Sequence, residues 1–158
     1  MSPAASLPGP GPLAGLDPGR SKCGLVLTDA ERQQIVAARV LPPQQALALL
    51  RHWQQGTGLA AVVLGNGTGS ALWQHQLAPE LLVLSVDERG STLAARERYW
   101  QLQPPLGWQR LLPRGLRQPP RDWDDVVAQL LLERWLGRPL IRPPSLLETQ
   151  KLARTVKA

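Results

Sequence analysis

Two continuous apolar segments constrain the fold of this chain more than any other feature. Leu59–Leu64 and Leu81–Val86 each run for six residues without a charged side chain, which is typical of strands buried on both faces of a parallel sheet. Parallel strands need a crossover between them, commonly a helix, and Ala71–Leu77 is compatible with one. A further helix is expected after the second segment, with Ser91 or Thr92 as its cap.

Antiparallel strands are expected before these two segments. Leu13–Leu16 leads through a glycine-bearing turn into Cys23–Leu27, and Gln34–Val40 carries β-branched residues that suit a third strand. Gln44–Gln55 then has apolar residues at helical spacing. Three leading strands followed by alternating strands and helices predict the α/β class, with a mixed sheet and helices on both of its faces.

The last predicted helix spans Val126–Leu136, with Asp122 as its N-terminal cap and Gly137 at its end. A chain of 158 residues can build one ordinary core, so we expect a single domain. The expected divisions are a disordered Pro/Gly-rich tail at 1–12, the domain at 13–137 with a loop near 104–120, and a loosely attached tail at 138–158.

The charge of the chain favours an anionic partner. The net charge is +6 and arginine supplies 15 of the 18 basic side chains, which suits bidentate contact with phosphate. Nucleic acid is the leading candidate, while an acidic protein or an anionic membrane surface stays open. No apolar segment approaches the roughly 20 residues that span a bilayer. The lone Cys23 excludes an internal disulfide, so we expect a cytoplasmic protein.

Arginines and aromatic residues are concentrated between residues 89 and 121. This stretch holds seven arginines, a single acid and two tryptophans. Such a combination suits single-stranded nucleic acid, because arginines bind the phosphate backbone and aromatic rings stack on the bases. The alternative is a solvated basic loop, with Trp100 packed onto the core. The predicted nucleic-acid-binding residues are Lys22, Arg89, Trp108, Arg110, Arg114 and Arg117.

Acidic residues stand at the ends of three predicted elements: Asp17, the pair Asp87-Glu88, and the pair Asp124-Asp125. Each has an ordinary explanation as a turn residue, a solvated strand end or a partner of the helix dipole. In a mixed sheet, however, the ends of the first strand and of the parallel strands lie close together. Converging carboxylates would need a cation, and their oxygen atoms favour Mg²⁺ or Mn²⁺.

Helical spacing separates the two acids of the last helix. Asp124 aligns with the apolar stripe, whereas Asp125 aligns with Gln129 and Glu133 on a face expected to be wetter. No serine, cysteine or histidine stands in a convincing nucleophilic arrangement, since His52 and His75 lie in predicted helices.

The segments Leu16–Val26, Val86–Thr92 and Asp124–Glu133 resemble the motifs of the YqgF family. That family is an RNase H-like group, described as Holliday-junction resolvase-like and as nucleases that mature ribosomal RNA precursors. The resemblance extends from about Leu13 to Leu136. It implies an RNase H-like mixed sheet, in which three antiparallel strands precede two parallel ones.

The resemblance also implies a metal-dependent nuclease. The catalytic metal ligands would be Asp17, Glu88 and Asp124, with Asp87 as the substitute for Glu88. The chain departs from the family at Gly65–Ser70, a glycine-rich loop that could hold a phosphate on its N–H groups or serve as a plain connector.

Three functions follow as hypotheses. The first is a nuclease that uses Mg²⁺ or Mn²⁺ on structured RNA or branched DNA. The second is a non-catalytic RNA- or DNA-binding module of the same fold, such as a ribosome-assembly factor. The third, a phosphotransferase of the actin-like group, is disfavoured because that architecture needs two such domains. A homodimer stays open.

Overall fold

A computed structural model describes residues 7–67, 69–102, 110–113 and 123–146. The strands are β1 (Leu13–Asp17), β2 (Cys23–Thr28), β3 (Ile35–Leu41), β4 (Ala61–Gly65) and β5 (Val83–Val86). The α-helices are α1 (Pro43–Thr57), α2 (Ser70–Leu77), α3 (Ser91–Leu102) and α4 (Asp124–Leu136). None of the described helices is long and apolar enough to cross a membrane.

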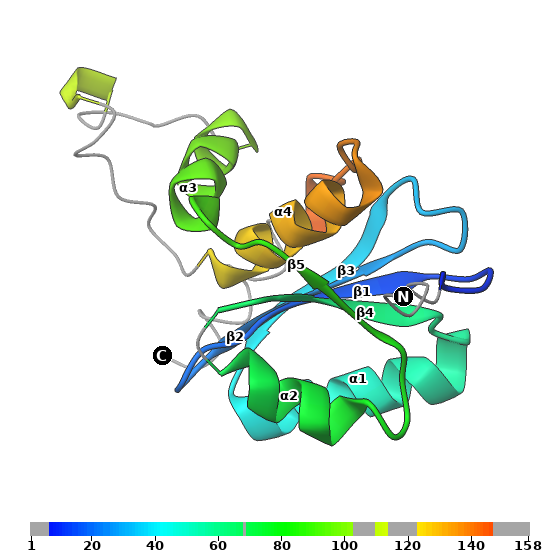
Figure 1. The fold of residues 1–158 in the computed structure, drawn as a ribbon. Helices are drawn as coiled ribbons and strands as arrows, with labels where there is room; N and C mark the ends of the chain where they lie inside the picture. The colour runs from blue at the N-terminus through cyan, green and yellow to red at the C-terminus, as the bar shows by residue number, and fades with distance from the viewer. Residues whose placement is uncertain (1–6, 68, 103–109, 114–122, 147–158) are drawn as a thin grey trace, which may run out of the picture.

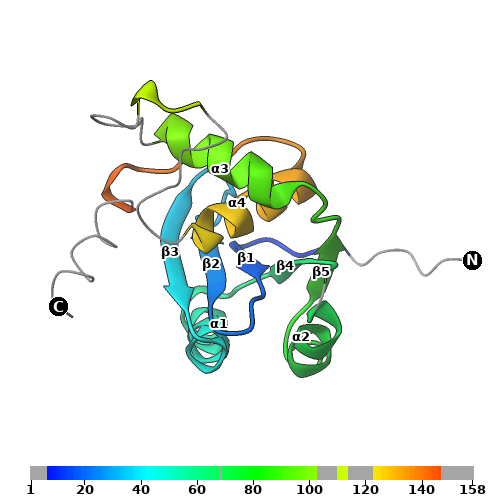
Figure 2. The same ribbon diagram turned by 90° about the vertical axis from the view of Figure 1, so that its left-hand side faces the viewer.

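The strands form one mixed sheet in the order β3-β2-β1-β4-β5. Neighbouring strands among β1, β2 and β3 are antiparallel, while β4 pairs parallel to β1 and β5 pairs parallel to β4. Helices α1 and α2 cover one face of the sheet, and α3 and α4 lie on the other (Figure 1; Figure 2). The predicted fold class is therefore confirmed.

The alternation of side chains along the strands divides the core between the two faces. Leu16 and Leu25 pack toward α1 and α2, whereas Leu13 and Val26 pack toward α4. Strand β4 is buried throughout, as its apolar sequence predicts. Strand β5 is different, because it is the sheet edge, spans only four residues and is half-buried. The prediction that both apolar segments are covered on both faces is therefore wrong for the second.

Two glycines allow α4 to lie directly on the first two strands. A Cβ atom on Gly15 would lie 2.6 Å from the carbonyl oxygen of Ala128, and one on Gly24 would lie 1.9 Å from that of Asp124. Real Cβ atoms do not approach backbone this closely, so a side chain at either position would push the helix away. The start of α4 is thus held against the Asp17 end of the sheet.

The predicted caps of the last two helices are not observed. Ser91 is already the first residue of α3 and is buried, so neither it nor Thr92 is the cap. Gly90 precedes the helix with a φ of 72°, a conformation that suits glycine. For α4, the N-cap position is Trp123, without a side-chain capping hydrogen bond. Asp122 lies outside the described residues.

Part of each expected tail is attached to the domain. Residues 138–142 were expected to be loose, but Leu140 is buried and the carbonyl oxygen of Ile141 accepts a hydrogen bond from the Ile35 backbone N–H, at 2.7 Å. Near the other end, Arg32 Nε donates to the carbonyl oxygen of Gly11 at 2.9 Å. The remainder of both tails, 1–6 and 147–158, lies outside the described residues.

Candidate metal centre

Asp17 and Asp124 are brought together by a glycine. Asp17 is the last residue of β1 and is paired with Gly24 of β2. The backbone of Asp124, the first residue of α4, lies on that glycine. Since paired Cα atoms of antiparallel strands are only about 5 Å apart, the first turn of α4 is held beside Asp17.

Glu88 reaches the same edge of the sheet through the glycine-rich loop. It follows β5 by two residues, and its carboxylate lies against the loop after β4. A Cβ atom on Gly65 would lie 2.4 Å from Glu88 Oε2, and one on Gly67 would lie 1.4 Å from Oε1. The backbone N–H of Glu88 also donates to Asn66 Oδ1 at 3.3 Å. The sequence did not predict that this loop makes room for the Glu88 carboxylate. The only signal in the sequence is the alternate spacing of its glycines.

Strand register places the three acids at one edge. Leu16 is level with Leu64 in the parallel pairing of β1 and β4, so Asp17 and Gly65, the next residues, end their strands together. Glu88 covers Gly65, on one side of Asp17. Asp124 lies on Gly24, the strand partner of Asp17 on the other side. The structure therefore brings Asp17, Glu88 and Asp124 to the carboxyl end of the central strands.

The charges of these carboxylates act on one another. Burial, and after it the negative charges of Asp124 and Glu88, together raise the pKa of Asp17 from its ordinary value of 3.8 to about 7. Desolvation and like charges both disfavour the ionised carboxylate. A neutralising cation would therefore favour the ionised form of Asp17.

The carboxylates do not form a closed cage. Within the described ranges, no three His, Cys, Asp or Glu side chains lie close enough to hold one metal ion together. The donor set nevertheless fits a hard divalent cation, because it consists of carboxylate oxygens. A bound cation would offset the repulsion that raises the pKa of Asp17.

The neighbouring acids have other partners. Asp87 Oδ1 accepts a hydrogen bond from the Arg89 backbone N–H at 2.9 Å, which stabilises the turn before α3. Asp125 is completely buried and forms an ion pair with Arg142, which is also completely buried. The prediction that Asp125 lies on a more solvent-exposed face of α4 is therefore wrong. Gln129 and Glu133 of the same face are buried as well, because residues 138–142 cover them.

The predicted nucleic-acid-binding residues are placed in part. Lys22 and Arg89 are exposed beside the carboxylates, Lys22 in the turn after β1 and Arg89 directly after Glu88. Arg110 is exposed in the described segment 110–113. Trp108, Arg114 and Arg117 lie outside the described residues. Trp100 packs against the cluster of α3 and α4 and meets Tyr99 edge to face, as expected for a core residue.

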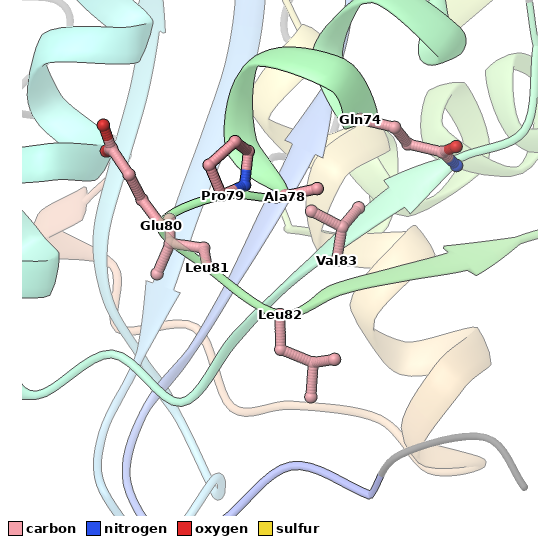
Figure 3. A pocket seen from close by; sticks show the side chains of 7 residues that line it. All are labelled: Gln74, Ala78, Pro79, Glu80, Leu81, Leu82 and Val83. Atoms are coloured by element: carbon pink, nitrogen blue, oxygen red, sulfur yellow. The ribbon is translucent and has the colours of Figure 1, made fainter.

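A cavity of about 540 Å³ lies away from this centre. Residues from the end of α2 to the start of β5 line it (Figure 3), whereas Glu88 follows the opposite end of β5. Its acid, Glu80, is engaged by Arg51 of α1 at 3.2 Å. The cavity therefore lacks a group for catalysis, and the carboxylate edge is the better candidate site.

No family model matches the sequence, and no curated protein is similar to it. Among solved structures, Thermus thermophilus RuvC in complex with a Holliday junction substrate is 17% identical; the match covers 82% of this chain and 99% of that chain, with a TM-score of 0.45. A second T. thermophilus RuvC structure gives the same identity and coverage, with a TM-score of 0.44. The large terminase nuclease from the thermophilic phage G20c is 14% identical over 84% of this chain and 58% of that chain, with a TM-score of 0.43. At this similarity, the function of the chain has to be inferred from its own residues.

Proposed function

We propose that this protein is a divalent-metal-dependent nuclease that hydrolyses phosphodiester bonds of structured nucleic acid. The observation that carries the proposal is the placement of Asp17, Glu88 and Asp124 at one edge of the sheet. They come from three elements far apart in sequence, and the close contacts at Gly24, Gly65 and Gly67 position them. A fold has little reason to gather repelling carboxylates unless they share a cation.

The residues around this edge have separate roles. Asp17, Glu88 and Asp124 would hold Mg²⁺ or Mn²⁺, with Asp87 as the substitute for Glu88. When bound, such ions activate water and stabilise the leaving oxygen in phosphodiester cleavage. Lys22, in the turn after Asp17, and Arg89, directly after Glu88, are exposed and would bind the phosphates flanking the scissile bond.

The variant Asp17→Asn tests the metal ligands. It removes a ligand charge while the basic surface remains, so cleavage should fall by at least about 100-fold and nucleic-acid binding should be largely unchanged. Cleavage of labelled ribosomal RNA precursor and of a four-way DNA junction, with Mg²⁺ or Mn²⁺, measures the effect and separates the two candidate substrates.

A matched control is Asp29→Asn. It also removes one negative charge, but Asp29 Oδ1 accepts backbone hydrogen bonds from Gln33 and Gln34, which an asparagine oxygen can keep. This control should cleave like the unmodified protein. Full cleavage by the Asp17 variant would eliminate Asp17 as a ligand.

A non-catalytic RNA- or DNA-binding module, such as a ribosome-assembly factor, is the second candidate. It is favoured by the open arrangement of the carboxylates, since the described residues include no closed group of three metal ligands. Purified protein that binds RNA but shows no metal-dependent cleavage, with or without Glu88→Gln, would support this function over the first.

A further inference from the structure

Three arginines line one groove between α3 and α4. Arg98 comes from α3, Arg134 from the last turn of α4, and Arg138 from the segment after it. The groove has a volume of about 340 Å³, and both helices lie side by side above the sheet (Figure 1; Figure 2). None of the three is among the nucleic-acid-binding residues predicted from the sequence.

Arg134 connects the groove to the carboxylate edge. Its Nη1 donates to the carbonyl oxygen of Asp87 at 2.7 Å, and the next residue along the chain is Glu88. The contact fixes the guanidinium at the start of the turn that carries Glu88. A strand that leaves the carboxylates along α3 and α4 would meet Arg134 first.

The other two arginines are fixed in a similar way. Arg98 Nη1 contacts Glu133 Oε2 at 3.0 Å, and an Arg138 side-chain nitrogen donates to the carbonyl oxygen of Arg32 at 2.5 Å. A guanidinium carries five N–H donors in a fixed fork, so these contacts leave donors for a further acceptor. Orientation before binding lowers the entropy cost of holding a ligand.

The charge balance of the groove favours an anion. Three arginines face a single acid, Glu133, whose Oε2 atom already accepts hydrogen bonds from Arg98, Gln129 and the Leu140 backbone N–H. The rest of the lining is apolar or proline. Fixed guanidinium groups that line a groove suit the phosphates of a strand, since planar N–H forks bind phosphate well.

We propose that the α3–α4 groove binds the phosphates of a nucleic-acid strand that extends from the carboxylate edge. The inference that the groove binds a strand depends only on the residues of the groove. The inference that this binding places a scissile bond at the carboxylates rests on the proposed nuclease function. Arg134 is then the first phosphate contact beyond Glu88, and Arg138 and Arg98 follow.

The test is the salt dependence of binding by the full chain with Arg134→Gln and Arg138→Gln combined. The probes are fluorescently labelled single-stranded RNA and a labelled four-way DNA junction, both in EDTA so that no cleavage occurs. Each lost phosphate contact should lower the slope of log K against log salt by about 1, so we expect a slope about 2 smaller and affinity at least about tenfold weaker at low salt.

Two further variants make the result specific. Arg39→Gln combined with Arg51→Gln removes the same charge from β3 and α1, away from the groove, and should leave the slope nearly unchanged. Arg134→Lys combined with Arg138→Lys keeps the charge and should retain most of the slope. Circular dichroism melting shows whether each variant is folded.

The proposal fails if the glutamine pair binds both probes with the original slope, or if the control pair lowers the slope equally. These results do not depend on catalysis. A protein that loses binding with the glutamine pair but never cleaves would support the groove and contradict the nuclease function. Metal-dependent cleavage by the unmodified protein, together with an unchanged slope in the glutamine pair, would support the nuclease function and contradict strand binding in the groove.

Discussion

At the scale of single residues, the absence of a side chain matters as much as its presence. The Glu88 carboxylate occupies the space that Cβ atoms of Gly65 and Gly67 would take. A glycine-rich loop after a strand is commonly read as a phosphate-binding turn. In this chain the same loop makes room for a carboxylate.

The variant Gly67→Ala should therefore separate activity from stability. Its Cβ would lie 1.4 Å from Glu88 Oε1, so the carboxylate must leave its position. Because Gly67 does not have a positive φ, alanine fits the backbone, and stability should change by less than about 1 kcal/mol. Metal-dependent cleavage should fall by about 10-fold or more.

Cleavage assays and thermal melting measure the two effects. Gly56→Ala is the control, because a Cβ there meets nothing within 4 Å and alanine is favoured in a helix such as α1. Unchanged cleavage by the Gly67 variant, with the control also active, would show that the position of Glu88 is not needed.

At the scale of elements, α4 is held at its first turn by a buried ion pair. Asp125 and Arg142 are both completely buried, and Arg142 Nη1 also donates to Gln129 Oε1 at 3.1 Å. Asp125 is next to Asp124, so the same pair that attaches residues 138–142 also fixes the helix end that carries a candidate ligand. The segment after α4 is thus part of the domain.

Arg142→Met should destabilise the fold by about 3–5 kcal/mol, because it leaves the Asp125 charge buried without its partner. Adding Asp125→Leu should recover most of that loss, since well-packed apolar residues can replace a buried ion pair. Urea unfolding of the single and double variants gives the coupling energy. Additive effects of the two changes would contradict a direct interaction.

The exposed pair Arg51–Glu80 provides the comparison. Its side chains are 48% and 42% exposed, so Arg51→Met should cost no more than about 1 kcal/mol. A similar loss of unfolding free energy in Arg142→Met and Arg51→Met would mean that burial does not determine the strength of these ion pairs.

At the scale of the whole molecule, the carboxylate edge should lower stability when no cation is bound. Asp17 has a pKa raised from 3.8 to about 7 in the folded state, so between these values the folded chain retains a proton that the unfolded chain has lost. Stability therefore falls as pH rises through this window and stays lower above it. The full effect is on the order of 4 kcal/mol at most, at 1.36 kcal/mol per pKa unit.

Unfolding free energies of the unmodified protein and of Asp17→Asn, compared across pH in EDTA, isolate this effect. The variant should gain stability relative to the unmodified protein as pH rises from about 4 to about 7. Saturating Mg²⁺ should stabilise the unmodified protein at about pH 8, and much less at about pH 5 or in the variant. A difference that does not change with pH would show that the pKa of Asp17 is not raised in the folded state.

The sequence by itself determined that antiparallel strands come first along the chain and parallel strands follow, and it placed the three acids at the ends of elements. These features follow from local patterns: β4 is uniformly apolar because both of its faces are covered, Asp17 and Glu88 stand where apolar segments stop, and Asp124 stands where the last helix begins. An apolar segment does not show whether it lies inside a sheet or at its edge, however, and β5 lies at the edge.

Only the tertiary structure decided which polar residues are buried. Asp125, Gln129 and Glu133 follow a polar stripe that predicts solvent exposure, yet Arg142 and Leu140 cover them from beyond the helix end. The contact of Glu88 with Gly67 likewise joins residues that are distant in sequence. Burial depends on what packs against a residue, and that partner can come from any part of the chain.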